Sequence, residues 1–246
     1  MLFTLMKQDF KNIITNPTIV LFSLIYPMVL VLIFGFLFSD LYQGDIVTSY
    51  DFYGVTMLFY LILESATMSP TVFMEERTKK ANMRIAYAPV SRVQIYASKL
   101  ITTFLFIGGG FLINILILNG IELVNFGGQN FLFVLLLFLL LLLFTITLGA
   151  AMCTLIKSEE WTNKIVGVTI NTLAIFSGVF FPIATLGKFA ESVANVIPVK
   201  IVLSTIFQLI YDNSMANYWS AIGITVACII VFIVIIHKNY HIEDYI

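Results

Sequence analysis

Charged residues are scarce in this chain, at 11% of its 246 residues. A soluble domain has about 25%, because its surface must face water. Hydrophobic residues make up 60% of the chain, and the mean hydropathy is +0.99. Packing alone cannot hide so apolar a surface from water, so lipid must solvate most of it. The composition therefore predicts a membrane protein and leaves no room for a separate soluble domain.

The sequence offers few residues for a disulfide, a metal site or a nucleic-acid site. Cys153 and Cys228 both lie inside apolar runs, so we interpret them as small hydrophobic residues, and the redox compartment stays undetermined. His237 and His241 are spaced i, i+4, but two histidines are too few ligands, and a polar tail beyond the last span explains them better than a metal site. The net charge of −1 and the local clustering of basic residues predict no nucleic-acid partner.

Motifs of the common nucleotide-binding and hydrolytic sites are also missing. The Gly187-Lys188 pair has Pro182 where the first glycine of a G-x-x-x-x-G-K-[ST] loop should stand, and Phe189 follows the lysine. Neither G-x-S-x-G nor H-E-x-x-H occurs. We therefore expect that this chain is not an enzyme and holds no cofactor of its own.

Long apolar runs, in contrast, are abundant. A membrane-spanning helix needs about 20 predominantly apolar residues. Six stretches qualify, namely residues 19–38, 52–73, 100–118, 131–156, 165–181 and 219–236. The predicted fold class is all-α: a polytopic membrane protein whose six transmembrane helices form one domain over residues 1–246.

Residues 1–16 predict a further helix before the first span. Its apolar side carries Leu2, Phe3, Met6, Phe10, Ile13 and Ile14, and its other side carries Lys7, Gln8, Lys11 and Asn12. Such an amphipathic helix is suited to lie in the lipid headgroup layer. Asn16-Pro17 interrupts the pattern and restarts a helix, and Pro27 predicts a kink near Tyr26. The first run has full span length and no small-residue cleavage site, so we interpret it as a retained span.

Lysine and arginine are distributed unevenly between the loops. With the N-terminus inside, all 13 except Lys188 and Lys200 fall in the inner loops and termini. The positive-inside rule then predicts that both termini are cytoplasmic, in a multi-pass protein of the inner (cytoplasmic) membrane.

Charge is concentrated in residues 75–91, between the second and third predicted spans. Glu75 and Glu76 precede several basic residues, the order that complements a helix dipole. Ala88-Pro89 ends this helix, because a residue before proline avoids the helical region. The pattern predicts a short cytoplasmic helix at a bend beneath the bilayer, although an ordinary positive-inside loop would explain the same residues.

The residue order of this segment resembles that of the type-2 ABC exporter permeases. In that family a pattern close to Glu-Arg-Glu-x-Gly-Thr-Leu-x-x-Leu-Leu-x-x-Pro-Val-Ser-Arg, with Lys-Leu further on, follows the second span. In register with it stand Glu76-Arg77, Ile85, Pro89-Val90-Ser91-Arg92 and Lys99-Leu100, whereas Lys80-Ala81 replaces the family's Gly-Thr. The fifth predicted span ends in the family's Ser-Gly-x-x-Phe-Pro as Ser177-Gly178-Val179-Phe180-Phe181-Pro182, and Pro198 matches a later proline. The aromatic residue that often follows that proline is replaced by Val199, Lys200 and Ile201.

The resemblance implies a machine of several subunits. Residues 75–91 would be its coupling region, docking through Glu76, Arg77, Arg84, Pro89, Ser91 and Arg92 onto two copies of a separate ATP-binding subunit that carries ATP and Mg. The permease would be a homodimer or a heterodimer with a similar chain. Residues 182–200 would dip back into the outer leaflet, with an outer gate formed by Ser177, Gly178, Phe181, Pro182 and Pro198. The cargo would be hydrophobic or amphipathic: a drug, a lipid, or a peptide toxin such as a bacteriocin or a phenol-soluble modulin. A polysaccharide stays open as an alternative cargo, because aromatic side chains also stack on sugars.

An acidic residue, Glu64, lies about midway along the second predicted span. A carboxylate at a helix centre costs on the order of 2.5–3.5 kcal/mol. One helical face carries Tyr53, Tyr60, Glu64, Thr67 and Thr71, at steps of seven, four, three and four. This stripe either borders the translocation path or forms a structural hydrogen bond between spans. Two further small or polar sets, Gly108 to Gly110 and the row Asn163, Gly167, Asn171, Ala174 and Gly178, predict close helix packing.

Two other classes of function stay open. An ion-coupled secondary transporter would use Glu64 for proton or sodium coupling and would need no ATPase. A membrane immunity factor would act by binding alone and would transport nothing.

Overall fold

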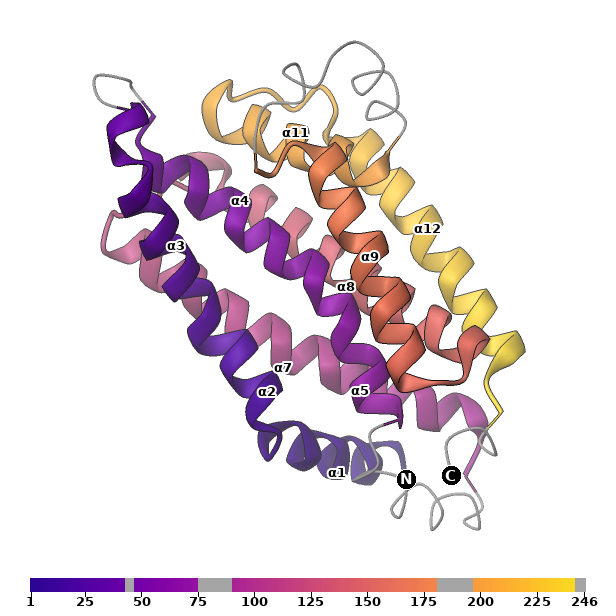
Figure 1. Cartoon of the computed structure of the whole chain (residues 1–246). Helices are drawn as coiled ribbons and strands as arrows, with labels where there is room; N and C mark the ends of the chain where they lie inside the picture. Colours follow the sequence, from indigo (N-terminus) through magenta and orange to yellow (C-terminus); the bar gives the residue numbers. More distant parts are fainter. Residues whose placement is uncertain (43–46, 75–89, 181–196, 242–246) are drawn as a thin grey trace.

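The computed structural model describes residues 1–42, 47–74, 90–180 and 197–241. Within these residues every regular element is a helix, and the helices form one elongated bundle (Figure 1). The predicted all-α class is confirmed.

The chain begins with helices α1 (Leu2–Ile14) and α2 (Pro17–Val20). A π-helical turn, η1 (Leu21–Ile25), leads from α2 into α3 (Tyr26–Leu37), and a 3₁₀ turn, η2 (Ser39–Tyr42), follows α3. Next come α4 (Ser49–Glu64), the 3₁₀ turn η3 (Ser65–Thr67), α5 (Met68–Met74) and α7 (Arg92–Gly120). The remaining elements are η4 (Gly128–Asn130), α8 (Phe131–Ile156), α9 (Glu159–Ser177), α11 (Pro198–Tyr211) and α12 (Tyr218–Asn239).

Five of the described helical runs are long and apolar enough to cross a membrane. They are Pro17–Leu37, Ser49–Met74, Arg92–Gly120, Gly128–Ile156 and Tyr218–Asn239. These runs correspond to five of the six predicted spans, so the chain is a multi-pass membrane protein. The fifth prediction, residues 165–181, overlaps α9, which is not among the five. Glu159, Glu160 and Lys164 at the start of α9, and asparagines and threonines further along, lower its hydropathy.

Local signals in the sequence set where several helices begin. Asn16 caps α2, because its side chain accepts a hydrogen bond from the Thr18 N–H at 3.0 Å, and Pro17 occupies the first turn as predicted. Thr48 and Asp51 form a reciprocal capping box at the start of α4. The π-helical turn η1 ends directly before Tyr26, the residue near which Pro27 predicts a kink.

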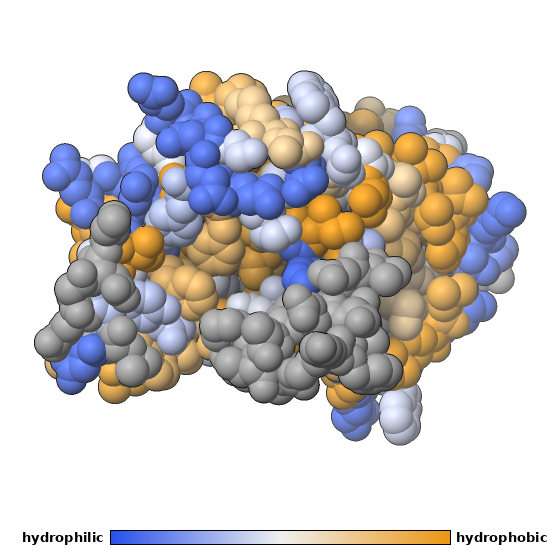
Figure 2. Space-filling view, turned by 90° about the horizontal axis from the view of Figure 1, so that it is seen from above, coloured by the Kyte–Doolittle hydropathy of each residue, from blue (hydrophilic) through white to orange (hydrophobic). Residues whose placement is uncertain are grey.

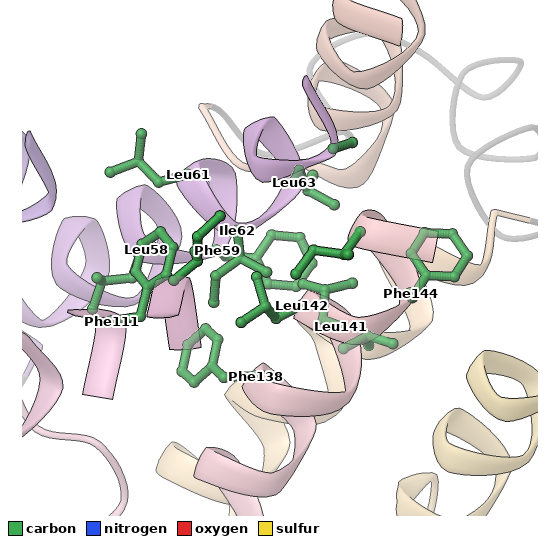
Figure 3. Packing of buried hydrophobic residues seen from close by; sticks show 14 of the residues in the cluster. Leu58, Phe59, Leu61, Ile62, Leu63, Phe111, Phe138, Leu141, Leu142 and Phe144 are labelled. Atoms are coloured by element: carbon green, nitrogen blue, oxygen red, sulfur yellow. The ribbon is translucent and has the colours of Figure 1, made fainter. Parts of the chain in front are cut away.

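The centre of the bundle is α4, packed against α8. In the most apolar part of Ser49–Met74, 72% of the residues are buried, compared with 28% in Pro17–Leu37 and 22% in Tyr218–Asn239. Leu58, Phe59 and Ile62 of α4 lie against Phe138, Leu141 and Leu142 of α8, with Phe111 of α7 beside them (Figure 3). Helices α3 and α12 turn large apolar side chains outward, as helices do where lipid is the solvent.

The two ends of the bundle differ. At one end of the bundle, Met1 and α1 lie close to the end of α5, the start of α7 and the end of α12 (Figure 1). Helix α11 lies across the opposite end, which shows a band of hydrophilic surface flanked by hydrophobic residues (Figure 2). Most of the predicted outer segment, residues 182–200, lies outside the described residues, and its last three residues form the first turn of α11, a helix that the sequence analysis did not predict.

Candidate functional site

The second span is interrupted beside Glu64. A 3₁₀ turn, η3, follows Glu64 directly and separates α4 from α5. Helix α8 holds this break by two side-chain hydrogen bonds. The Ser65 and Thr145 hydroxyl oxygens lie 3.0 Å apart, and the Ser69 hydroxyl donates to the Ile146 carbonyl at 2.8 Å. One face of the break is therefore fixed to the core.

A glycine allows α8 to come this close. A Cβ at Gly149 would lie 1.9 Å from the backbone oxygen of Ala66 in η3, a distance that no real side chain could keep. The absence of a side chain at Gly149 thus places the backbone of α8 in direct contact with the break.

The other face of the break carries a polar cluster, which we define as Tyr60, Glu64 and Asn171. The Tyr60 hydroxyl lies 3.4 Å from Glu64 Oε1 and 3.1 Å from Asn171 Oδ1 of α9, and its single proton can serve only one of them at a time. The Asn171 amide donates to the Gly167 carbonyl at 2.9 Å. Glu64 Oε2 is buried and has no hydrogen-bond partner among the described residues. A buried acceptor without a partner costs free energy, so this oxygen can gain a donor only if the side chains around it rearrange.

The structure divides the predicted stripe on the second span. Tyr53 lies apart from the polar cluster, is 6% exposed and stacks on Phe38, the residue directly after α3, with ring centres 4.9 Å apart. The Thr67 hydroxyl donates to the Glu64 backbone oxygen at 2.8 Å, and Thr71 is half-buried on α5. Tyr60 and Glu64 thus belong to one site, while Tyr53 belongs to the packing between α3 and α4.

Polar side chains of α9 are exposed next to this cluster. Thr169, Asn171 and Thr172 are exposed, and the two threonine hydroxyls bond only to carbonyls of their own helix, each at 2.8 Å. A Cβ at Gly167 would meet no atom within 4 Å, so this part of the predicted small-residue row makes no close contact within the described chain. Ala174, in contrast, is fully buried. The α9 face around Asn171 is open in a single chain.

Ser177 and Gly178 of the predicted outer gate end α9, and Phe180, two residues further on, contacts the polar cluster. Gly178 ends α9 in the left-handed conformation at φ 81°, and the Val179 N–H reaches back to the Ala174 carbonyl at 3.4 Å, the glycine-terminated cap of many helices. Ser177 is buried, and its hydroxyl donates to the Leu173 carbonyl. The Phe180 ring centre then lies 5.1 Å from that of Tyr60.

The remaining gate residues do not join this contact. Phe181 and Pro182 lie outside the described residues. Pro198 opens α11, across the end of the bundle away from the termini.

Most of the predicted coupling residues lie outside the described residues, namely Glu76, Arg77, Arg84 and Pro89. Ser91 caps α7, because its hydroxyl accepts from the Gln94 N–H at 3.3 Å. Arg92 Nη1 lies 3.4 Å from His241 Nδ1, at the exposed end of the bundle.

A buried ion pair at this end was missed by the sequence analysis, which placed Lys99 in an inner loop. Lys99 is 3% exposed and Asp9 is 7% exposed, and their charged atoms lie 3.9 Å apart. The Ser98 hydroxyl donates to the other Asp9 oxygen at 2.5 Å, and Lys99 Nζ donates to the Val72 carbonyl at 3.1 Å. Burial raises the pKa of the Asp9 carboxyl, while the Lys99 ammonium and the Ser98 hydroxyl oppose that shift.

The described residues bring together no group of three histidine, cysteine, aspartate or glutamate side chains that could hold a metal ion.

A family model described as ABC-2 family transporter protein matches residues 42–238. The match includes the polar cluster, α9 and all of α11, and it leaves out α1 and α3. No curated protein matches the chain. Because the family model covers most of its length, the chain belongs to the ABC-2 family of transporter proteins and is the membrane permease component of an ABC transporter.

Proposed function

We propose that this chain spans the membrane six times and is one half of a dimeric export permease, driven by two separate ATP-binding subunits, that moves hydrophobic or amphipathic molecules out of the cell. The observation that carries the proposal is the polar cluster of Tyr60, Glu64 and Asn171 on a face left open by the single chain.

Helix α9 would supply the sixth span. Tyr240, next to the end of α12, contacts Phe73, and Phe73 lies by Lys99, the partner of Asp9 in α1. Both ends of the chain therefore lie on one side of the bundle, which requires an even number of crossings. Helix α9 also contacts α4, α8 and α11, so it extends along the bundle between its two ends. The excess of lysine and arginine on the side of the termini supports a cytoplasmic location for that side.

A second permease chain would cover the open face. The exposed amide of Asn171 is costly to leave in lipid, which offers polar groups no partners, and the exposed Thr169 and Thr172 beside it make this face more polar still. Pairing through this face buries them and brings two polar clusters together at the interface. A path between the chains would then be lined by Tyr60 and Glu64, with Phe180 at its outer side and the gate residues Ser177, Gly178, Phe181, Pro182 and Pro198 beyond.

The lining favours an amphipathic cargo. The aromatic rings of Tyr60 and Phe180 offer apolar contact, and the half-buried Glu64 side chain offers a carboxyl acceptor beside them. A membrane-active peptide, a lipophilic drug and a lipid all present such a mixture. The energy would come from ATP and Mg on the partner subunits, which dock onto the coupling region through Glu76, Arg77, Arg84, Pro89, Ser91 and Arg92.

Reconstitution tests the proposal. The permease is purified with the ATP-binding subunit that accompanies it, placed in liposomes and supplied with ATP and Mg. Three probes are followed: rhodamine 6G, a dansylated amphipathic peptide and a fluorescent phospholipid. We expect ATP-driven movement of at least one probe and its loss in Glu64→Gln, whereas Glu160→Gln, on an exposed turn of α9, leaves it unchanged.

Three results would contradict the proposal. Movement driven by a proton or sodium gradient without ATP would assign Glu64 to ion coupling. Binding without movement of any probe would favour an immunity factor. A Glu64→Gln variant that transports at the normal rate would exclude the carboxyl from the path.

A further inference from the structure

We propose that the buried pair of Asp9 and Lys99 is a clamp that makes the coupling region move as one body with the membrane helices. The inference rests on the proposed drive through residues 75–91, and it assigns a positioning role to two side chains that lie outside that region. The clamp consists of Asp9, Ser98, Lys99 and the Val72 carbonyl.

The clamp joins both ends of the coupling region. Helix α5 ends at Met74, directly before residues 75–91, and α7 begins at Arg92, directly after them. Lys99 belongs to α7, donates to Val72 on the last turn of α5 and faces Asp9 of α1. One side chain thus links the helix that enters the coupling region, the helix that leaves it, and the amphipathic helix beneath the bundle.

Aromatic contacts extend the clamp to the last span. The Phe73 ring lies 5.8 Å from Lys99 Nζ and 6.2 Å from the Tyr240 ring. Tyr96, one turn before Lys99, lies 5.6 Å from Tyr240, and its hydroxyl lies 3.1 Å from His237 Nδ1 of α12. The end of α12 is therefore held by the same group of side chains.

The free energy of unfolding does not explain why charged residues, and not apolar ones, occupy this position. Removing two charges from water costs several kcal/mol per ion, and an apolar pair of similar volume is often as stable or more so. Charged groups instead form hydrogen bonds that require a particular distance and direction between the helices. Ser98 and the Val72 carbonyl fix one Asp9 oxygen and the Lys99 ammonium at 2.5 Å and 3.1 Å, so the three helices have one preferred register. Apolar side chains would keep the helices together but would not fix that register.

Burial also excludes the alternative roles of such a pair. With 7% and 3% exposure, Asp9 and Lys99 cannot touch an ATP-binding subunit or a cargo molecule directly. They act only through the helices that carry them.

Hydrogen exchange in the complete complex tests the clamp. The permease and its ATP-binding subunit are placed in lipid nanodiscs, and amide exchange in residues 75–91 and in α1 is measured with and without ATP and Mg. The variants are Asp9→Asn, Lys99→Met and the apolar double change Asp9→Leu with Lys99→Met. The control is Lys164→Met, which breaks the exposed pair of Lys164 with Glu160.

In the wild type, ATP should change exchange in residues 75–91 and in α1 together. Each single variant should lower the Tm by about 6–20 °C, because it leaves a buried charge without its partner. The double variant should regain most of that Tm, yet its α1 response to ATP should stay about two- to thirtyfold weaker than that of the wild type. Lys164→Met should change neither quantity.

Different failures point to different errors. If residues 75–91 of the wild type do not respond to ATP, the proposed drive is wrong and the clamp is overturned with it. If they respond and the α1 response of the double variant equals that of the wild type, the drive stands and only the clamp is overturned.

Discussion

Replacing Gly149 by alanine tests whether the break after Glu64 is held by direct contact of two backbones. The added Cβ would lie 1.9 Å from the Ala66 oxygen, 2.9 Å from its carbonyl carbon and 3.2 Å from its Cα. Because all three are backbone atoms, no side-chain rotation can relieve the overlap. The oxygen must move by about 1.1 Å to reach 3.0 Å, the shortest separation that real Cβ atoms show.

The expected cost follows from two opposing effects. Overpacking a filled interior costs about 1–3 kcal/mol, whereas alanine is favoured over glycine inside a helix by about 1 kcal/mol. The bonds of Ser65 to Thr145 and of Ser69 to Ile146 connect the same two backbones, so a shift that relieves the overlap stretches both. Strain in these two bonds costs about 1 kcal/mol and offsets the helix preference of alanine. We therefore expect a net loss of roughly 1–3 kcal/mol, which corresponds to a fall in Tm of about 2–12 °C.

Thermal unfolding of the purified permease in detergent, followed by tryptophan fluorescence, measures this loss. Gly223→Ala is the matched control, because a Cβ at Gly223 meets nothing within 4 Å on an exposed side of α12. This control should raise the Tm slightly, since only the helix preference of alanine acts there. Equal Tm values for Gly149→Ala and Gly223→Ala would refute the close approach of α8 to η3.

Two further predictions concern the contact of α7 with the π-helical turn. Gly110→Ala should lower the Tm, because its Cβ would lie 2.8 Å from the Ser23 backbone oxygen, whereas Gly109→Ala, which meets nothing within 4 Å, should not; equal values would contradict this contact. Asn114→Leu should cost about 1–3 kcal/mol in thermal unfolding, because the two N–H groups of the Asn114 amide are shared among the Gly110 carbonyl at 2.8 Å and the Ser23 and Leu24 carbonyls at 3.2 Å, and lipid offers the oxygens of the π turn no other donor. An unchanged Tm for Asn114→Leu would show that the π turn satisfies its own carbonyls.

Hydropathy predicted most of the fold because length and apolarity are local properties. Five runs matched predicted spans, and Asn16-Pro17 restarted a helix where its cap geometry requires one. Helix α11 was missed for the same reason, since its 14 residues are too few for a span. Its signal was nevertheless present: Pro198 starts it, and apolar residues recur at helical spacing, at Val199, Val202, Leu203, Ile206, Leu209 and Ile210.

The stripe on the second span shows the limit of helical periodicity. Steps of three and four residues share a face only while each residue turns the helix by about 100°. The 3₁₀ turn η3 turns faster, at three residues per turn, so the residues after Glu64 lose register with those before it. Asn171, which completes the polar cluster, lies on another helix, and only the tertiary fold brings it to Tyr60.

The pair of Asp9 and Lys99 could be half anticipated. Asp9 stands on the apolar side of α1, four residues before Ile13 and three after Met6, where a carboxylate needs a buried partner. That the partner would be Lys99 could not be read from the sequence, because 90 positions separate the two and the positive-inside pattern favours a solvated loop for any lysine there.

The proposed path beside Glu64 and the proposed clamp at Lys99 lie at opposite ends of α5, and the length of this helix sets the distance between them. Lys99 holds α5 at Val72, and η3 ends the helix on its other side, directly beside Glu64. A helix rises 1.5 Å per residue, so the seven residues of Met68–Met74 span only about 10 Å. Helix α8 fixes the break through Ser69 and Gly149, so a displacement imposed at the clamp cannot pass along α5 without turning it about that contact. The carboxyl that borders the proposed path is therefore next to the pivot of the short helix that the coupling region would push.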